Sequence, residues 1–93
     1  MRIVGEKRIR EFVSEVPIAA GAMKLWIQSV RASAWRNPDE LKSTFPSASF
    51  VGGLTVFNIG GNKYRLAAFV HYRCGAVYIK RIGTHQEYDQ WEL

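Results

Sequence analysis

Two residues near the C-terminus, His85 and Tyr88, are spaced as neighbours on one face of a helix. Two cations, Arg65 and Lys80, precede them in stretches that alternate like β-strands. An imidazole titrates near neutral pH, a phenol can donate a proton or stack on a base, and guanidinium and ammonium groups bind phosphate oxygens. Such a set could cleave RNA by using the RNA's own 2′-hydroxyl as the nucleophile. That reaction needs a base, an acid and cations for the phosphorane charge, and it needs no metal.

Each of these residues also has a purely structural interpretation. A histidine at a helix start is often a surface residue beside a cap, and a tyrosine is often a core or rim aromatic. Arginine and lysine on a sheet are often no more than solvated surface cations. His71 and Cys74 have the spacing of two zinc ligands, but two ligands are too few for a structural site, so we expect no metal and no cofactor.

The second half of the chain has the pattern of a three-stranded antiparallel sheet that would position these residues. The expected strands are 54–59, 62–73 and 76–82. The breaks between them contain the glycines that tight hairpin turns require. Along the middle strand an apolar set of side chains alternates with a largely basic set. On the last strand Tyr78, Lys80 and Ile82 are expected to share one face, so that Lys80 lies near Arg65 across the sheet.

The segment after the sheet carries a helix-start signal. Thr84 and Glu87 have the spacing of a capping box, so a helix of one or two turns is expected to begin at His85. His85 and Tyr88 would then lie on one side of this helix, where the basic strand ends. The first amides of the helix would also favour a phosphate.

The first half of the chain is expected to supply a helical hairpin that covers the apolar face of the sheet. The expected elements are a strand at 2–4, helices at about 6–15 and 19–35, a short helix between Asn37 and Pro46, and a loop at 47–53. Pro17 ends the first helix. Asn37 is the expected cap of the short helix, with Glu40 placed to close a capping box. Trp26 and Trp35 have helical spacing and are assigned to the core rather than to base stacking. The fold class is therefore α+β.

Composition favours a single domain, residues 1–93, with a polyanionic partner. Thirteen Lys and Arg residues against eight Asp and Glu residues leave a net charge of +5. Nucleic acid, an acidic protein or an anionic membrane surface would suit this charge, although a basic surface can also serve solubility alone. The lone Cys74 cannot form an intrachain disulfide, and no stretch is long enough for a membrane span or a signal-peptide core. We expect a cytoplasmic protein that does not enter a membrane.

Two segments, FNIGGNKYRL at 57–66 and THQEYD at 84–89, resemble the HigB toxins in their order and spacing. The likeness extends to Tyr72-Arg73, to 77–80 and upstream to 35–38 and 45–48. HigB toxins are type II toxin–antitoxin mRNA interferases of the RelE/ParE superfamily. The resemblance implies a RelE-like microbial RNase fold, in which an N-terminal helical hairpin packs on a small, mostly antiparallel sheet with a short C-terminal helix.

The same resemblance implies a metal-independent endoribonuclease that cleaves mRNA, in many relatives on the translating ribosome. It also implies that a helix-turn-helix HigA antitoxin neutralises the toxin in a hetero-oligomer. The residues that it implies as catalytic are Arg65, Lys80, His85 and Tyr88, and those that it implies as substrate-binding are Asn62, Lys63, Arg73 and Tyr78. Lys80 stands where relatives often carry arginine. Two alternatives stay open: a non-catalytic nucleic-acid or ribosome-binding module, and a ParE-like toxin directed at DNA gyrase on the same fold.

Overall fold

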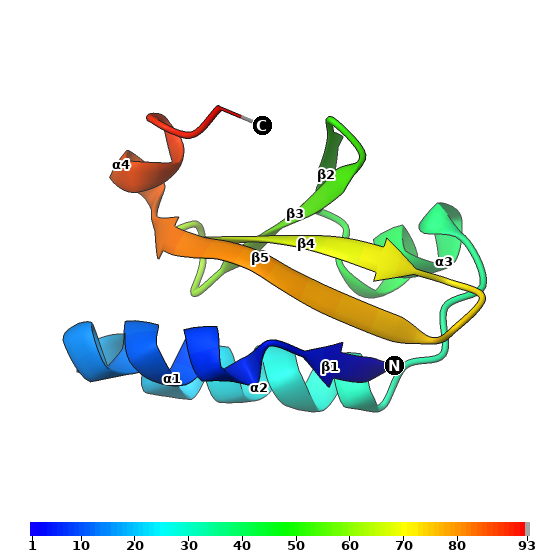
Figure 1. Ribbon diagram of the computed structural model, residues 1–93, viewed down its shortest axis with the longest axis horizontal. Coiled ribbons are helices and arrows are strands. Elements are labelled where there is room, and N and C mark those ends of the chain that lie inside the picture. Colours follow the sequence, from blue (N-terminus) through cyan, green and yellow to red (C-terminus); the bar gives the residue numbers. More distant parts are fainter. Residues whose placement is uncertain (93) are drawn as a thin grey trace.

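The computed structural model describes residues 1–92 and has the predicted α+β architecture. In this part of the chain a five-stranded sheet lies over two helices that cover one of its faces (Figure 1). The strands are β1 (Arg2–Val4), β2 (Ser49–Val51), β3 (Leu54–Ile59), β4 (Tyr64–His71) and β5 (Ala76–Thr84). The helices are α1 (Glu6–Glu15), the 3-10 helix η1 (Pro17–Ala19), α2 (Ala20–Arg31), α3 (Pro38–Thr44) and α4 (His85–Tyr88).

The strands are arranged in the order β1-β5-β4-β3-β2. β1 pairs in parallel with β5, and the other neighbours pair antiparallel. The predicted strand at 2–4 and the three predicted strands of the second half are confirmed. The segment 47–53, expected as a loop, instead contains β2, which forms a hairpin with β3 through Gly52 and Gly53 at φ of 57° and 81°. None of the three β2 residues is fully buried and the first two are both exposed, so no alternation of apolar and polar positions marks this strand in the sequence.

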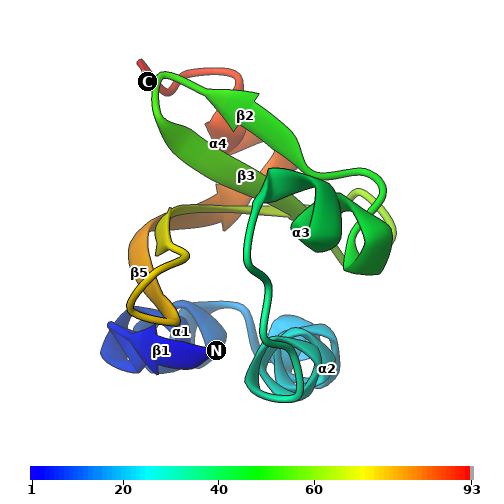
Figure 2. The ribbon, with the colours of Figure 1, turned by 90° about the vertical axis from the view of Figure 1, so that its right-hand side faces the viewer.

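Helices α1 and α2 lie side by side beneath the sheet and run in opposite directions (Figure 2). The carboxylate of Glu6, in the first residue of α1, forms an ion pair with Arg31, the last residue of α2. This pair joins the start of one helix to the end of the other. The predicted antiparallel hairpin is therefore confirmed.

Helix α2 is shorter than the predicted helix at 19–35 and ends at Arg31. The N-terminal ammonium group of Met1 donates to the carbonyl of Val30 at 3.1 Å and also to the carbonyl of Ser33. A cation is favourable at a helix C-terminus, where the last carbonyls have no intrahelical partner. The contact satisfies these carbonyls without a further helical turn.

Both tryptophans of the first half are core residues, as predicted. Trp26 is 3% exposed and packs edge-to-face against Phe57, with ring centroids 5.3 Å apart. Trp35 is 4% exposed, and its indole N–H donates to the hydroxyl of Thr44 at 2.9 Å. The two rings hold α2 and the segment before α3 against the sheet.

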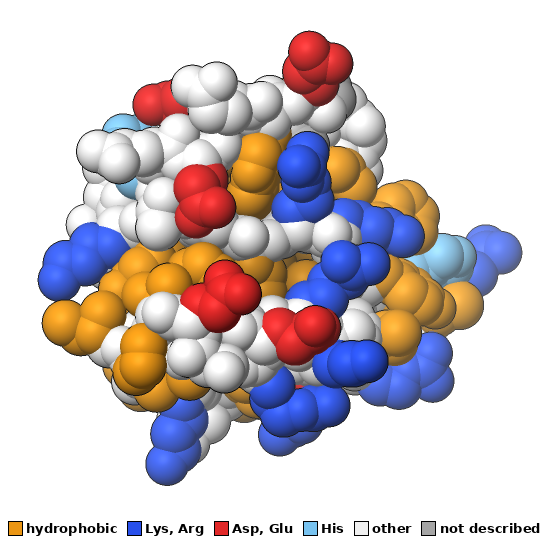
Figure 3. Space-filling view, turned by 60° about the vertical axis from the view of Figure 1, so that its left-hand side comes forward, with side chains coloured by type: hydrophobic (Ala, Val, Ile, Leu, Met, Phe, Trp, Pro, Cys, Tyr) orange, Lys and Arg blue, Asp and Glu red, His pale blue; other side chains and the backbone are white. Residues whose placement is uncertain are grey.

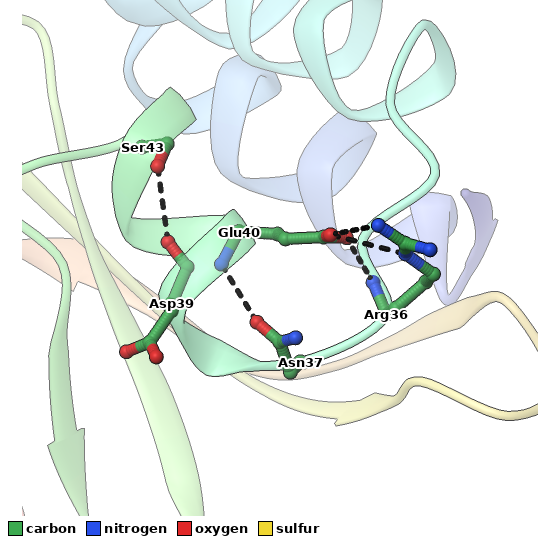
Figure 4. A network of polar contacts seen from close by, with 5 residues as sticks. All are labelled: Arg36, Asn37, Asp39, Glu40 and Ser43. Carbon is green, nitrogen blue, oxygen red and sulfur yellow. Dashed lines mark hydrogen bonds and ion pairs between the residues drawn. The ribbon is translucent and has the colours of Figure 1, made fainter.

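Figure 4 shows the N-terminal cap of α3. The side-chain oxygen of Asn37 accepts from the backbone N–H of Glu40 at 2.9 Å, as predicted. The Glu40 carboxylate does not return to Asn37. It accepts instead from the Arg36 guanidinium at 2.9 and 3.0 Å and from the Arg36 backbone N–H at 2.7 Å. The side-chain hydrogen bond from Arg36, followed by the backbone bond, lowers the pKa of Glu40.

A bulge in β5 changes which side chains share a face of the sheet. Ala67 pairs with Arg81, and Lys80 is left as an extra residue opposite the same point of β4. Ile82 is thereby returned to the core face, where it packs against the buried cluster. The prediction that Ile82 shares the face of Lys80 is wrong for this reason. Arg81 takes a position on the face of Arg65, because its partner Ala67 lies two residues from Arg65 along β4.

Candidate active site

Arg65 is the centre of the polar cluster at the end of β4. Its side chain is buried, with 7% of the residue exposed. One terminal nitrogen, Nη1, donates to the carbonyls of Asn62 at 3.1 Å and Tyr64 at 3.3 Å. The other, Nη2, donates to Oδ1 of Asn62 at 2.6 Å and to Nδ1 of His85 at 2.9 Å. The guanidinium carbon also lies 5.5 Å from the centre of the Tyr88 ring. Arg65 therefore connects the β3–β4 turn to α4.

The β3–β4 turn has the backbone conformation needed to aim two acceptors at Arg65. Gly60, Gly61 and Asn62 have φ angles of 67°, 61° and 83° in succession. This left-handed region is open to glycine, and asparagine enters it more readily than other residues with a Cβ atom. The sequence Gly-Gly-Asn thus allows both the carbonyl and the side chain of Asn62 to face the guanidinium.

Helix α4 begins at His85 because its predicted capping box is formed. The Thr84 hydroxyl accepts from the Glu87 backbone N–H at 3.2 Å, and the Glu87 carboxylate accepts from the Thr84 N–H at 2.9 Å. The backbone N–H of His85 donates to the carbonyl of Lys63 at 2.9 Å. Two of the first amides of this one-turn helix therefore have protein partners, which leaves fewer of them for the phosphate that the sequence suggested here.

The contact with Arg65 determines which ring nitrogen of His85 carries the proton. A guanidinium group only donates hydrogen bonds, so Nδ1 of His85 must be the acceptor. The neutral ring then carries its proton on Nε2. The cluster therefore offers an imidazole N–H donor of defined tautomer, held beside a permanent positive charge and the phenol ring of Tyr88.

Three further residues complete this face of the sheet, and the sequence analysis missed them. Gly83 pairs with Arg65, and a Cβ atom at Gly83 would lie only 2.8 Å from Cζ2 of Trp91. Trp91 packs against Tyr88, with ring centroids 5.5 Å apart, and the guanidinium carbon of Arg81 lies 5.1 Å from the Trp91 ring. A glycine inside a strand often marks such a close approach, which is the signal that could have revealed this contact.

Lys80 is exposed and lines a pocket of about 390 Å³ at the end of the sheet. The pocket is lined from α1 by Arg8, Glu11 and Glu15, and from the sheet and the C-terminal segment by Lys80, Arg81 and Trp91. Figure 3 views the end of the molecule where α1 and α4 lie. Most Lys and Arg side chains of this view occupy its right and lower parts, with Asp and Glu side chains towards its centre and top. The pocket itself therefore has mixed charge.

Two of the predicted substrate-binding residues lie away from His85. Tyr78 pairs with Phe69 in the half of the β4–β5 hairpin that is nearer its turn. Arg73 lies in the turn at the far end of the hairpin, beyond the roughly 20 Å of strand that separate Arg65 from His71. The structure thus brings Asn62, Lys63, Arg65, His85 and Tyr88 together, places Lys80 at the edge of this region, and separates Arg73 from it.

His71 and Cys74 contact each other rather than forming part of a larger cluster. The backbone N–H of Cys74 donates to Nδ1 of His71 at 3.1 Å. Within residues 1–92, no three His, Cys, Asp or Glu side chains gather closely enough to hold a metal ion. No helix in the same range has the length and apolar character that crossing a membrane requires.

Comparison with known proteins identifies the family. The mRNA interferase toxin HigB of Escherichia coli K12 is 27% identical over 92 residues, which cover 96% of this chain and 88% of the relative. The mRNA interferase HigB of Shigella flexneri matches with the same values, and that of E. coli O6:H1 is 24% identical over 93 residues, covering 97% and 90%. Residues 19–91 match the family described as the RelE-like toxic component of a toxin–antitoxin system. The chain therefore belongs to the HigB toxin family.

Proposed function

We propose that this toxin is an endoribonuclease that cleaves mRNA by attack of the RNA 2′-hydroxyl on the adjacent phosphate. The observation that supports this function best is the contact between Arg65 and His85, in which a buried cation orients an exposed imidazole. The relatives that carry the name mRNA interferase support mRNA as the substrate. A toxin of this kind stops growth by removing messages from translation.

In the proposed reaction the 2′-oxygen forms a bond to phosphorus while the bond from phosphorus to the 5′-oxygen breaks. The proton of the 2′-hydroxyl passes to a base, and a second proton reaches the departing 5′-oxygen from an acid. The products are a 2′,3′-cyclic phosphate and a 5′-hydroxyl. Because the nucleophile belongs to the RNA, no metal-bound water has to be generated.

His85 and Tyr88 are the proton-transfer groups of this proposal. With Nδ1 held by Arg65, the Nε2–H of His85 can donate a hydrogen bond to a phosphorane oxygen. When Arg65 releases Nδ1, the ring can accept the 2′-hydroxyl proton as the base while the Tyr88 phenol supplies the proton of the departing oxygen. The phenol of Tyr88 lies beside the same guanidinium and is the second candidate for proton transfer or for contact with a base. Asn62 holds Arg65 from the opposite side and thereby fixes the geometry of the set.

The exposed cations around this cluster are proposed to hold the RNA phosphates. Lys63 lies directly beside the start of α4, and Lys80 and Arg81 lie together in the bulge of β5. Arg65 has its terminal N–H groups occupied by protein acceptors, so we assign it first to positioning His85. A phosphate contact by Arg65 requires one of these bonds to be exchanged.

Membership of a family of toxin–antitoxin toxins implies that this protein has an antitoxin partner. We propose that the antitoxin is a HigA-like helix-turn-helix protein that forms a hetero-oligomer with it, and that the mRNA is cut on the ribosome in the cytoplasm. The net charge of +5 is consistent with an acidic antitoxin segment and with RNA.

The test is product analysis with purified protein and a defined mRNA, given alone and on translating ribosomes, with and without EDTA. Ends that carry 2′,3′-cyclic phosphate and 5′-hydroxyl, formed equally in EDTA, are expected. The control is His85→Ala, which should remain folded by circular dichroism and lose cleavage. Recovery of 5′-phosphate ends, dependence on a divalent metal, or full cleavage by His85→Ala would contradict the proposed chemistry. Normal RNA binding without any cleavage by the unmodified protein would indicate a binding module.

A further inference from the structure

Phe69 is an exposed aromatic residue on a strand whose other side chains are largely buried. It is 42% exposed, whereas Ala67, its predecessor on the same face of β4, is fully buried. Tyr78 lies directly opposite on β5, with ring centroids 6.3 Å apart and an angle of 44° between the ring planes. His71 packs edge-on against the Phe69 ring as well, with centroids 6.0 Å apart. The ring therefore contacts two neighbouring rings and is still 42% exposed.

This aromatic pair lies on the same face of the sheet as the Arg65–His85 cluster. Arg65, Ala67 and Phe69 alternate along β4, so Phe69 follows Arg65 by roughly 13 Å of strand. The position between them has a small side chain, Ala67, and its partner across the sheet is the exposed cation Arg81. The order along the sheet is thus a proton-transfer cluster, a cation and an aromatic pair.

We propose that Phe69 and Tyr78 form a stacking platform for one nucleobase of the single-stranded RNA whose scissile phosphate lies at His85. The proposal rests on the function proposed above and adds a base-binding subsite to it. Proteins that hold single-stranded nucleic acids combine cations along the backbone with aromatic faces for the bases, and such stacking accepts any base. Arg81 lies where the phosphate between the two sites would pass.

RNA suits this face better than a protein partner does, because its exposed apolar residues, Phe69 and the Val4 that pairs with Tyr78, form a narrow row beside the cation Arg81 rather than a broad apolar patch. Phe50, the other exposed phenylalanine, is 49% exposed and lies on β2 opposite Thr55, whose partner Ala68 belongs to the core-facing set of β4. Phe50 therefore lies outside the row that contains Arg65 and Phe69. It provides a control of equal chemistry.

Removal of the Phe69 ring is expected to weaken RNA binding by about fivefold to a hundredfold, the usual effect of losing one base-stacking contact. Phe69→Tyr should retain binding, because it keeps an aromatic face. Phe50→Ala should bind RNA like the parent. All variants should remain folded, since neither phenylalanine is part of the buried core.

The experiment is an abasic scan in the His85→Ala background, so that the RNA stays intact. RNA oligonucleotides with one abasic residue at each position in turn are titrated against the parent protein, Phe69→Ala and Phe50→Ala. One abasic position should weaken binding to the parent and to Phe50→Ala, and should cause no further loss with Phe69→Ala. Such non-additivity shows that the ring and that base contact each other.

Three outcomes would overturn the proposal. In the first, each abasic position lowers the RNA affinity of the parent and of Phe69→Ala by the same factor. In the second, no abasic position changes the RNA affinity of the parent. In the third, Phe69→Ala binds RNA like the parent but forms a weaker complex with the antitoxin. The last would make this face a protein-docking surface. Cleavage chemistry is measured separately from this binding, so the absence of cyclic-phosphate products would contradict the proposed function without deciding the stacking.

Discussion

Replacement of Arg65 with alanine is expected to lower both the stability and the activity of this toxin, whereas His85→Ala should lower activity with a smaller loss of stability. Arg65 is buried and joins the β3–β4 turn to α4 through Asn62 and His85. His85 is exposed and has one side-chain partner, Arg65, among the described contacts. The two variants therefore separate a positioning residue from a residue that meets the substrate.

The magnitude follows from the partners that Arg65 would leave behind. Its terminal nitrogens bond to four acceptors, and a buried bond that involves a charged group contributes about 1.5–3 kcal/mol. Three of these acceptors belong to Asn62 and His85, which are exposed and can bond to water instead. We therefore expect a total loss of about 1–3 kcal/mol rather than the full sum. His85→Ala removes one of the four acceptors of Arg65, but because His85 is exposed a water molecule can replace it, so its cost should stay below about 1 kcal/mol.

Both variants are also expected to lower the rate of RNA cleavage, each for its own reason. Loss of a proton-transfer group typically lowers the rate by about a hundredfold to ten-thousandfold, which we expect for His85→Ala. A displacement of about 1 Å in a reacting group can cost about a hundredfold, which we expect for Arg65→Ala. Arg65→Lys keeps the charge but cannot reproduce the planar fork, so it should resemble Arg65→Ala in rate.

Urea unfolding followed by tryptophan fluorescence measures the free energy of unfolding, and cleavage of a defined mRNA measures the rate. Arg73→Ala is the matched control, because Arg73 is exposed at the far end of the same hairpin. It should retain the parent's stability. If Arg65→Ala unfolds at the parent's urea concentration and loses only RNA affinity, Arg65 is a phosphate ligand and the positioning argument is wrong.

Three further predictions concern other parts of the chain. Gly83→Ala places a Cβ atom 2.8 Å from Trp91, below the ordinary contact of about 3.5 Å, so it should lower stability by about 1–3 kcal/mol and slow RNA cleavage. Adding Trp91→Ala should restore part of the stability. A Gly83→Ala variant that is fully stable and active would contradict the contact. Glu40→Gln should lower the free energy of unfolding at neutral pH and make it fall less steeply in acid. The pKa of Glu40 is lowered in the folded state, so its carboxylate stabilises the fold above the unfolded-state pKa, and this stabilisation is lost as the pH falls through the folded-state pKa. Urea unfolding measured across a pH series checks this. The association rate with the antitoxin should fall as salt rises, and a rate independent of salt in stopped-flow mixing would refute electrostatic capture.

Local patterns in the sequence were sufficient to predict most elements of the fold. The glycine breaks separate β3, β4 and β5, and the Thr84–Glu87 box starts α4, because turns and caps depend on residues a few positions apart. The core positions of Trp26 and Trp35 follow from helical spacing for the same reason. The candidate cluster of Asn62, Arg65, His85 and Tyr88 could also be anticipated, through the order and spacing of its two motifs.

The tertiary structure decided how that cluster is used. Alternation along β4 predicted an exposed basic face, but Arg65 is buried there because Asn62 and α4 enclose its guanidinium. The bulge at Lys80 moved Ile82 to the core, and the contact of Trp91 with Gly83 covered this end of the sheet. These features depend on pairing between strands and on packing of the C-terminal segment against β5. They join residues distant in sequence, and no local period encodes which of them will meet.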